Sequence, residues 1–384
     1  MNGNTPGLWA VSCPKSIQYD IAVCGDIFEK ENDALASIGA GYGSRRFIVL
    51  DSKLESWESK IKSYFDSLGI VTKIVLFQAG EENKTIAGAM RLIDVLDIFP
   101  INRRSEPIIA IGGGVLTDLV AFVASIYRRG VPHVKVPTTL MGYIDAAVGI
   151  KCGVNSKKGK NRIGAFEPPL KVLLDKTFLW TLPDRHILNG LGEIIKLAVI
   201  LDAKLFEELE SVGSECVARK FQSSSDEKIL KRSVDIMVQE LASNPYEENL
   251  CRAVDFGHTF SPAYEMESRH KILHGEAVLI DIILSVFLAN IKGILSAEQM
   301  LRILNLTQLF PWQFPGILIE SASLWDSLNE RTCHRDGKQR VPLPRVIGEG
   351  IFVNDITFAE LDAANSRLKK WIGDDGTICE RRCG

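Results

Sequence analysis

IIAIGGGVLTDLVAF, residues 108–122, is the stretch that decides the fold. Its apolar start predicts a buried strand, its three glycines a tight turn, and the pattern from Val115 onward an amphipathic helix. A strand that leads through a glycine turn into a helix N-terminus forms a phosphate cradle, because backbone N–H groups point at the bound anion. Glycine triplets also occur in ordinary turns. The stretch therefore predicts a dinucleotide-binding domain that the rest of the sequence has to support.

The surrounding sequence alternates between strand and helix patterns. β-Branched apolar runs lie at 46–50, 71–77, 107–111 and 133–136, and helical patterns lie at about 54–68, 85–98 and 115–128. This alternation predicts a parallel sheet with crossover helices. After Pro183 the sequence is mostly helical, at about 187–210, 226–243, 257–268, 275–293 and 296–308. We predict a Rossmann-like α/β domain at 1–182 and an α-helical domain at 183–384, with the boundary near the Thr181-Leu182-Pro183 turn.

Composition narrows the function classes. The chain has 384 residues, with 45 basic and 48 acidic residues and a net charge of -3, so no positive surface for nucleic acid is expected. The N-terminus lacks the basic and apolar segments of a signal peptide, and we expect no membrane-spanning run. Eight cysteines lack zinc-ribbon spacing, so reduced thiols and a cytoplasmic location are expected.

A second stretch indicates a metal site. CRAVDFGHTFSPAYEMESRHKILHGEA, residues 251–277, contains His258 and His274, and Glu193 lies upstream in NGLGEIIK. Together these residues would give a divalent ion three protein ligands and an open position, as catalysis requires. A single histidine is more often a core or surface side chain, and Glu193 could cap its helix. A nucleotide site joined to a metal site suggests redox chemistry on a hydroxyl.

Acidic and basic residues at the predicted strand ends extend the nucleotide site. Asp51 ends the RFIVLD strand, the position expected of an acid that binds adenosine ribose hydroxyls. Glu81 and Lys84 begin another helix at the same edge, and Asp118 lies one turn into the helix after the glycines. Such residues are also common helix caps and dipole partners.

Many motifs occur in order: GEENK, GGGVLTD, YRRG, PTTL, IDAAVGIKCGVN, GKNRIGAF, NGLGEIIK, DFGHT and LHGEAV. From about residue 45 to 355, the chain resembles the sugar phosphate cyclase superfamily, whose best-known member is 3-dehydroquinate synthase. The resemblance implies a Rossmann-like NAD-binding domain, an α-helical metal-binding domain and a homodimer. It also implies a zinc or cobalt ion held by Glu193, His258 and His274.

The resemblance assigns further residues. It implies that NAD contacts Asp51, Glu81, Lys84, Gly113, Gly114, Val115, Asp118, Thr138, Thr139, Asp145, Lys151 and Lys160. It implies that the catalytic and substrate-binding groups are Asp145, Lys151, Lys160, Asn161 and Lys196, and that Arg129 of YRRG reaches the substrate phosphate of the neighbouring subunit. The chemistry agrees, because a sugar phosphate needs cations for its dianion and a metal to polarise the oxidised hydroxyl. Most lysines are solvated surface residues, but Lys196 lies in an apolar stretch.

At several positions the sequence differs from the dehydroquinate synthase pattern, and these differences bear on which substrate is bound. Pro262 replaces the second histidine of a GHTxxH pattern, and ungapped counting places Met237 and Cys251 where that family binds a substrate carboxylate with cations. A buried carboxylate without a partner costs several kcal/mol, so a neutral sugar fits better. Asp255 replaces the family asparagine, and we expect it to accept hydrogen bonds from sugar hydroxyls.

Among cyclases that use sedoheptulose 7-phosphate, the strings DFGHTFSPA, HGEA and HRDGKQRVPLP most resemble the 2-epi-5-epi-valiolone synthase group, and His334 of the last string is a further substrate-binding candidate. The implied reaction yields 2-epi-5-epi-valiolone and phosphate through transient NAD-dependent oxidation, β-elimination of phosphate, re-reduction and intramolecular aldol closure.

Other readings stay open at this point. A 2-epi-valiolone synthase or a desmethyl-4-deoxygadusol synthase would use the same substrate. A metal-dependent polyol dehydrogenase would release NADH stoichiometrically, whereas the cyclase releases none. The residues at 127–129 and the KNRIGAF segment favour phosphate handling and therefore the cyclase. A non-catalytic NAD-binding relative is disfavoured by the intact metal triad.

Overall fold

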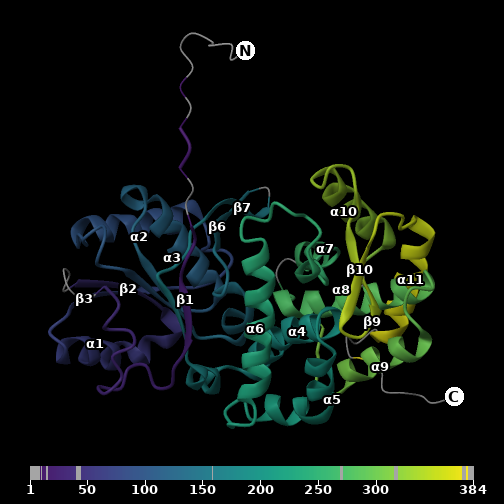
Figure 1. Cartoon of the computed structure of the whole chain (residues 1–384), viewed down its shortest axis with the longest axis horizontal. Helices are drawn as coiled ribbons and strands as arrows, with labels where there is room; N and C mark the ends of the chain where they lie inside the picture. The colour runs from purple at the N-terminus through teal and green to yellow at the C-terminus, as the bar shows by residue number, and fades with distance from the viewer. Residues whose placement is uncertain are drawn as a thin grey trace, which may run out of the picture.

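The computed structural model describes residues 9, 11–13, 16–39, 45–157, 159–268, 271–314, 319–373 and 378. A sheet flanked by helices lies on the left of Figure 1, a mostly helical half lies on the right, and α6 runs between them. We predicted reduced cysteines, and the six cysteines among the described residues are all free. Cys379 and Cys383 lie outside the described residues.

The sheet has six strands in the order β1-β8-β5-β4-β2-β3, and every pair of neighbours is parallel. Its strands are β1 (Asp20–Val23), β2 (Arg45–Asp51), β3 (Val71–Phe77), β4 (Ile108–Gly112), β5 (His133–Pro137) and β8 (Lys171–Leu174). The predicted parallel sheet is therefore confirmed, although β1 and β8 were not predicted. Because the strands are parallel, Asp51, Gly112 and Pro137 end at the same edge of the sheet.

The helices of this half are α1 (Glu58–Ser67), α2 (Ile86–Ile98) and α3 (Gly114–Ile126). They agree with three predicted helical patterns, except that Ser52–Trp57 forms a separate 3-10 helix before α1. A π-helical turn, η3 (Gly142–Ala146), follows β5, and an antiparallel hairpin of β6 (Lys151–Ser156) and β7 (Gly159–Phe166) extends from the sheet half. The hairpin was not predicted.

The other half contains α4 (Asp184–Ile200), α5 (Ala203–Ala218), α6 (Glu227–Ser243), α7 (Ser261–Glu267), α8 (His274–Ile291), α9 (Ala297–Gln308), α10 (Ser321–Cys333) and α11 (Phe358–Trp371). Two predictions here are wrong in detail. The helix expected at 187–210 is two helices, because Asp202 accepts a hydrogen bond from the Leu205 N–H and so caps a new one. The helix expected at 257–268 begins only at Ser261, since Gly257 has a φ of 74° that a helix does not allow.

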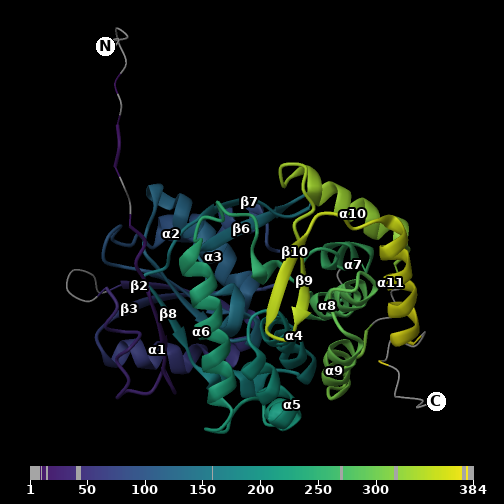
Figure 2. The same ribbon diagram turned by 45° about the vertical axis from the view of Figure 1, so that its right-hand side comes forward.

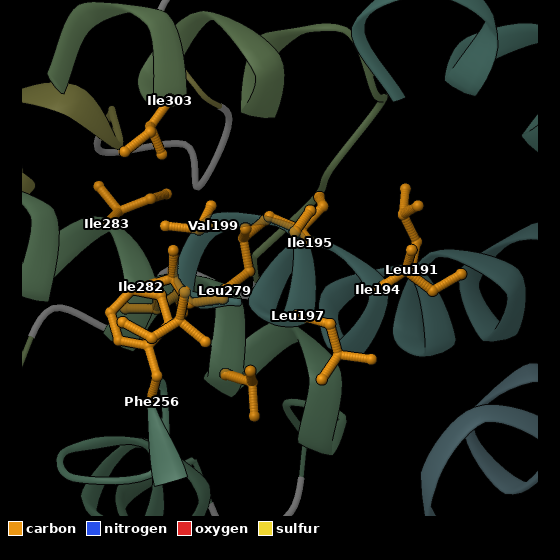
Figure 3. Close-up of a cluster of buried hydrophobic side chains, with 14 of the residues drawn as sticks. Leu191, Ile194, Ile195, Leu197, Val199, Phe256, Leu279, Ile282, Ile283 and Ile303 are labelled. Atoms are coloured by element: carbon orange, nitrogen blue, oxygen red, sulfur yellow. The ribbon is translucent and has the colours of Figure 1, made fainter. Parts of the chain in front are cut away.

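The core of the helical half lies between α4 and α8. Figure 3 shows Val199 of α4 near Leu279 and Ile282 of α8, with Leu191 and Ile194 farther along α4, and all of these side chains are buried. α8 is long and apolar enough to cross a membrane, contrary to our expectation, but 83% of its residues are buried inside the protein. The predicted buried helix after His274 is therefore confirmed, and its apolarity is explained by the core.

A second hairpin, β9 (Val341–Val346) and β10 (Glu349–Val353), covers α4 and α8 and comes forward in Figure 2. Its first strand includes the proline-rich piece at 342–344. The division into domains at residues 182 and 183 stays a prediction, because the large apolar core runs from Leu140 in the sheet half to Ile372 near the end of the described chain.

Candidate active site

The glycine turn lies where β4 passes into α3. Gly113 is the N-cap of α3, and the Thr138 N–H donates to the Gly112 carbonyl at 3.0 Å. A Cβ atom on Gly114 would lie 2.7 Å from the Ala146 Cβ, and one on Gly113 would lie 3.1 Å from the Thr139 Cγ2. A side chain at Gly114 would therefore force Ala146 to shift, and one at Gly113 would crowd Thr139, so the backbone at the start of α3 packs closely in this turn.

The predicted ribose acid adjoins this turn. Asp51 is the last residue of β2. A Cβ atom added to Gly112 would lie 3.3 Å from the Cβ of Asp51. The Asp51 carboxylate accepts a hydrogen bond from the Lys53 N–H at 3.1 Å, so the residue also caps the following turn. Burial raises the pKa of Asp51.

Three predicted residues from distant segments meet beside α3. The Lys84 Nζ donates to the Asp118 Oδ2 and to the Asn161 Oδ1, both at 2.7 Å. Lys84 is only 3% exposed, so these two partners satisfy a cation that water hardly reaches. The structure therefore joins α3, the GEENK turn and the start of β7 through one lysine.

Asn155 organises the same region and received no role from the sequence. Its Nδ2 donates to the Glu81 Oε2 at 2.7 Å, and its Oδ1 accepts from the Asn161 N–H at 2.9 Å. Its own N–H donates to the Lys84 carbonyl at 2.7 Å. The only available signal was its place at the end of the motif IDAAVGIKCGVN, because its partners lie up to 74 residues away.

The three predicted metal ligands lie close together in the helical half. One ligand atom each of Glu193, His258 and His274 lies within 4.8 Å of the other two. The Glu193 Oε1 is 3.6 Å from the His258 Nε2 and 3.4 Å from the His274 Nε2. Ligand atoms at about 2.0–2.1 Å from a tetrahedral zinc ion are separated by roughly 3.4 Å. The spacing therefore fits one ion held by these three side chains.

The ring of each histidine is oriented by an acceptor at its Nδ1. The His258 Nδ1 lies 3.1 Å from the Phe256 carbonyl oxygen, and the His274 Nδ1 lies 2.8 Å from the Glu265 Oε1. An acceptor at Nδ1 fixes the proton there and leaves Nε2 free to bind a metal. Glu265 also forms an ion pair with Lys160.

The local charges are consistent with a metal site. Glu193 is fully buried, and its Oε1 accepts no hydrogen bond from any described residue, whereas its Oε2 is paired with the buried Lys196. Burial lowers the pKa of His258 to about 3, with a contribution from Lys196, so its imidazole is neutral at physiological pH. Burial lowers the pKa of His274 as well, but Glu193 and Glu265 outweigh it and raise the pKa to about 10.

Asp145 and Lys151 lie around this centre. Burial and the charge of Glu193 raise the pKa of Asp145, which the lysine at 196 partly offsets. The Lys151 Nζ is 2.6 Å from the Glu247 Oε1, and its side chain is 58% exposed. Lys151 is therefore reachable from solvent, unlike Lys196.

Arg129 lies at the opposite end of α3 from the glycine turn. It is exposed and follows the C-terminal end of α3, about 18 Å along the helix from the glycine turn. Arg103 donates to the carbonyl oxygens of Arg129 and Gly130, both at 3.3 Å. Its role toward the phosphate of a neighbouring subunit stays a prediction.

Asp255, which we predicted to accept hydrogen bonds from sugar hydroxyls, already has partners within the chain, and its contact with a sugar stays a prediction. Its carboxylate accepts hydrogen bonds from Arg252, Arg331 and Arg335. Burial alone would raise the pKa of Asp255, but the three guanidinium groups hold it well below its usual range. Met237 and Cys251 themselves carry no charge, but three arginines lie around Asp255, and its one carboxylate does not balance their three positive charges.

The remaining substrate candidates differ in exposure. Met237 is buried in the apolar core on α6, so its environment requires an apolar residue there. Cys251, Pro262 and His334 are exposed, with Pro262 in the first turn of α7 and His334 just after α10. Their roles toward a substrate stay predictions.

Comparison with known proteins agrees with this geometry. The family model for the N-terminal part of 3-dehydroquinate synthase matches residues 74–189, and the model for its C-terminal part matches residues 190–330. A 2-epi-5-epi-valiolone synthase from Streptomyces albus is 43% identical over 384 residues, covering 96% of this chain and 92% of the relative. The chain belongs to the sugar phosphate cyclase family.

Two further relatives place the chain within the sugar phosphate cyclases. The structure of ValA, a 2-epi-5-epi-valiolone synthase from Streptomyces hygroscopicus subsp. jinggangensis 5008 with NAD+ and Zn2+ bound, is similar with a TM-score of 0.88 and 40% identity, covering 94% of this chain and 99% of ValA. A demethyl-4-deoxygadusol synthase from Trichormus variabilis is 35% identical over 358 residues, covering 91% of this chain and 87% of the relative.

Proposed function

We propose that this sugar phosphate cyclase converts sedoheptulose 7-phosphate to 2-epi-5-epi-valiolone and phosphate. The observation that carries the proposal is the meeting of Glu193, His258 and His274 around one position, in a chain 43% identical to a 2-epi-5-epi-valiolone synthase. The identity to a demethyl-4-deoxygadusol synthase is lower, at 35%. A 2-epi-5-epi-valiolone synthase from Streptomyces glaucescens is also 35% identical, so what favours the valiolone product is the identity of 38–43% to four other such synthases.

The residues fit both implied cofactors. The Glu193 Oε1, buried and without a hydrogen-bond donor among the described residues, offers a carboxylate oxygen beside two histidine nitrogens, a set that suits zinc or cobalt. The helix start at Gly113 and Gly114, with Asp51 at its side, suits a dinucleotide. When bound, NAD supplies a recycled hydride acceptor and the metal polarises the hydroxyl that is oxidised.

The lysines handle charge and position. Lys196 is buried next to Glu193 and Asp145, so it places a positive charge beside the oxygen atoms that gain negative charge. Lys151, Lys160 and Asn161 come from the β6–β7 hairpin and are proposed to hold the phosphate. Lys151 can do so only by leaving Glu247, its partner here.

The substrate chemistry follows from this arrangement. A transient ketone at C5 acidifies the neighbouring C–H bond at C6, so the C7–O bond to phosphate breaks by β-elimination, and the phosphate itself accepts the proton. After C5 is reduced again, the ring opens and the enolate carbon attacks the C2 carbonyl, forming the C–C bond of the carbocycle. The site holds the successive conformers while no net oxidation occurs.

We propose further that the protein acts as a homodimer in the cytoplasm. Exposed Arg129, at the opposite end of α3 from the glycine turn, is proposed to reach the phosphate in the partner subunit. The free described cysteines suit a reducing compartment.

One experiment tests the function. The purified protein is incubated with sedoheptulose 7-phosphate, catalytic NAD+ and zinc, and the product is identified by NMR. We expect 2-epi-5-epi-valiolone, one phosphate per turnover and no net NADH at 340 nm. Stoichiometric NADH would support a polyol dehydrogenase instead, and the NMR coupling pattern of another stereoisomer would support the 2-epi-valiolone alternative.

A further inference from the structure

Glu265 is a buried carboxylate that contacts both halves of the molecule. It lies on α7 and is 6% exposed. Its Oε1 is 2.8 Å from the Nδ1 of His274, the histidine that begins α8. Its Oε2 forms an ion pair with Lys160, which lies on β7 in the hairpin that extends from the sheet half. The two oxygens thus serve a metal-site histidine and a nucleotide-side lysine.

The contacts continue from Lys160 to the glycine turn. Asn161, the next residue, accepts a hydrogen bond from the Lys84 Nζ at 2.7 Å, and Lys84 is paired with Asp118 on α3. Asn161 has a φ of 53°, and its N–H is held by the Asn155 Oδ1 at 2.9 Å. These contacts hold the Asn161 backbone in the left-handed region, which few residues other than glycine adopt. The start of β7 is therefore a defined link rather than a loose loop.

We propose that Glu265 is a positioning residue that couples metal binding to NAD binding, an inference that rests on the function proposed above. A metal on the His274 Nε2 fixes that imidazole and, through its Nδ1 proton, the Glu265 carboxylate. The fixed carboxylate holds Lys160 and the adjoining Asn161 in place. A cofactor that binds afterwards has less ordering to complete, so each ligand strengthens the binding of the other.

Glu265→Gln separates the two tasks of this residue. The amide oxygen still accepts a hydrogen bond from His274, but the amide group carries no charge for Lys160. We therefore expect this variant to keep most of its zinc affinity while losing the coupling. Glu265→Ala removes both contacts, and its zinc affinity should fall about 10- to 100-fold.

Isothermal titration measures the coupling. NAD+ is titrated into chelator-dialysed protein with and without zinc, and zinc affinity is measured by competition with a chelator. In the wild type, zinc should tighten NAD+ binding about fivefold or more. In Glu265→Gln, this ratio should fall to about one. Glu210→Gln is the matched control, because it breaks the Glu210–Arg302 ion pair between α5 and α9, and its ratio should equal that of the wild type.

A double-mutant cycle tests the route through Lys160. If Glu265 acts on NAD+ through this lysine, Glu265→Gln has no further effect on the coupling in a Lys160→Met background. The proposal is overturned if zinc leaves NAD+ affinity unchanged in the wild type, or if Glu265→Gln retains the full ratio. A wild type that binds neither zinc nor NAD+ would instead contradict the proposed function.

Discussion

Glu193 and Asp255 are both buried carboxylates of the helical half, yet their surroundings differ. Asp255 accepts hydrogen bonds from three arginines. Glu193 faces two imidazole nitrogens at 3.4 and 3.6 Å and has one oxygen without a donor from any described residue. Lys196 pairs with the Oε2 of Glu193 and offsets its charge, so the Oε1, which faces the two imidazoles, is the atom available to a ligand. The comparison separates a carboxylate that binds a ligand from one that stabilises the fold.

Removing a metal ligand should have the largest effect. His258→Ala deletes one of two nitrogen ligands, so the protein should lose zinc and its turnover should fall about a thousandfold or more, while NAD+ still binds. Metal content by atomic emission and phosphate release measure the two losses. A variant that keeps stoichiometric zinc and full activity would remove His258 from the site.

Removing the satisfied carboxylate should instead affect folding. Asp255→Ala leaves three largely buried guanidinium groups without their shared partner, which should lower the free energy of unfolding by about 3–5 kcal/mol. Urea denaturation measures the change. Asp336→Asn is the matched control, because it removes the exposed partner of Arg340 and should cost less than about 1 kcal/mol. Equal losses in both variants would contradict the comparison.

Substrate choice tests whether the arginines around Asp255 are available. An incoming carboxylate would have to compete with Asp255 for these arginines, so the acid sugar of dehydroquinate synthase should react on the order of a hundredfold less efficiently than sedoheptulose 7-phosphate. Side-by-side phosphate-release assays measure the ratio. Asp255→Asn frees positive charge and should shift the ratio toward the acid sugar. Comparable rates of the wild type on both substrates would show that these arginines are free to bind a substrate carboxylate.

The smallest expected effect concerns pH. Because the arginines depress the pKa of Asp255 in the folded state, the unfolded chain takes up the proton more readily as the pH falls. The stabilisation by Asp255 is therefore complete well above its unfolded pKa of about 3.9 and decreases below it. The stability difference between the wild type and Asp255→Asn should shrink by about 1 kcal/mol from pH 7 to pH 3. A difference that grows on acidification would contradict the assignment.

The sequence by itself determined the features that local patterns encode. The strand, glycine turn and helix at 108–122 depend on neighbouring residues, and the buried helix after His274 depends on its own apolar composition. The metal triad was also predictable, because its residues lie in recognisable motifs and metal chemistry permits few residue types. The helix end at Ile200 was predictable in principle from the cap at Asp202, but continuous apolar periodicity concealed it.

Only the tertiary structure decided which polar groups pair. Asp255 meets Arg331 and Arg335 across 76 and 80 residues, and the hydrogen bond from Asn155 to Glu81 spans 74. No local periodicity encodes such contacts, because they form when separate elements are packed against one another. The same carboxylate could have been open to a substrate or closed by arginines, and the sequence pattern is identical in both cases. The difference is in long-range packing, which sets both the free energy of a buried charge and its availability to a ligand.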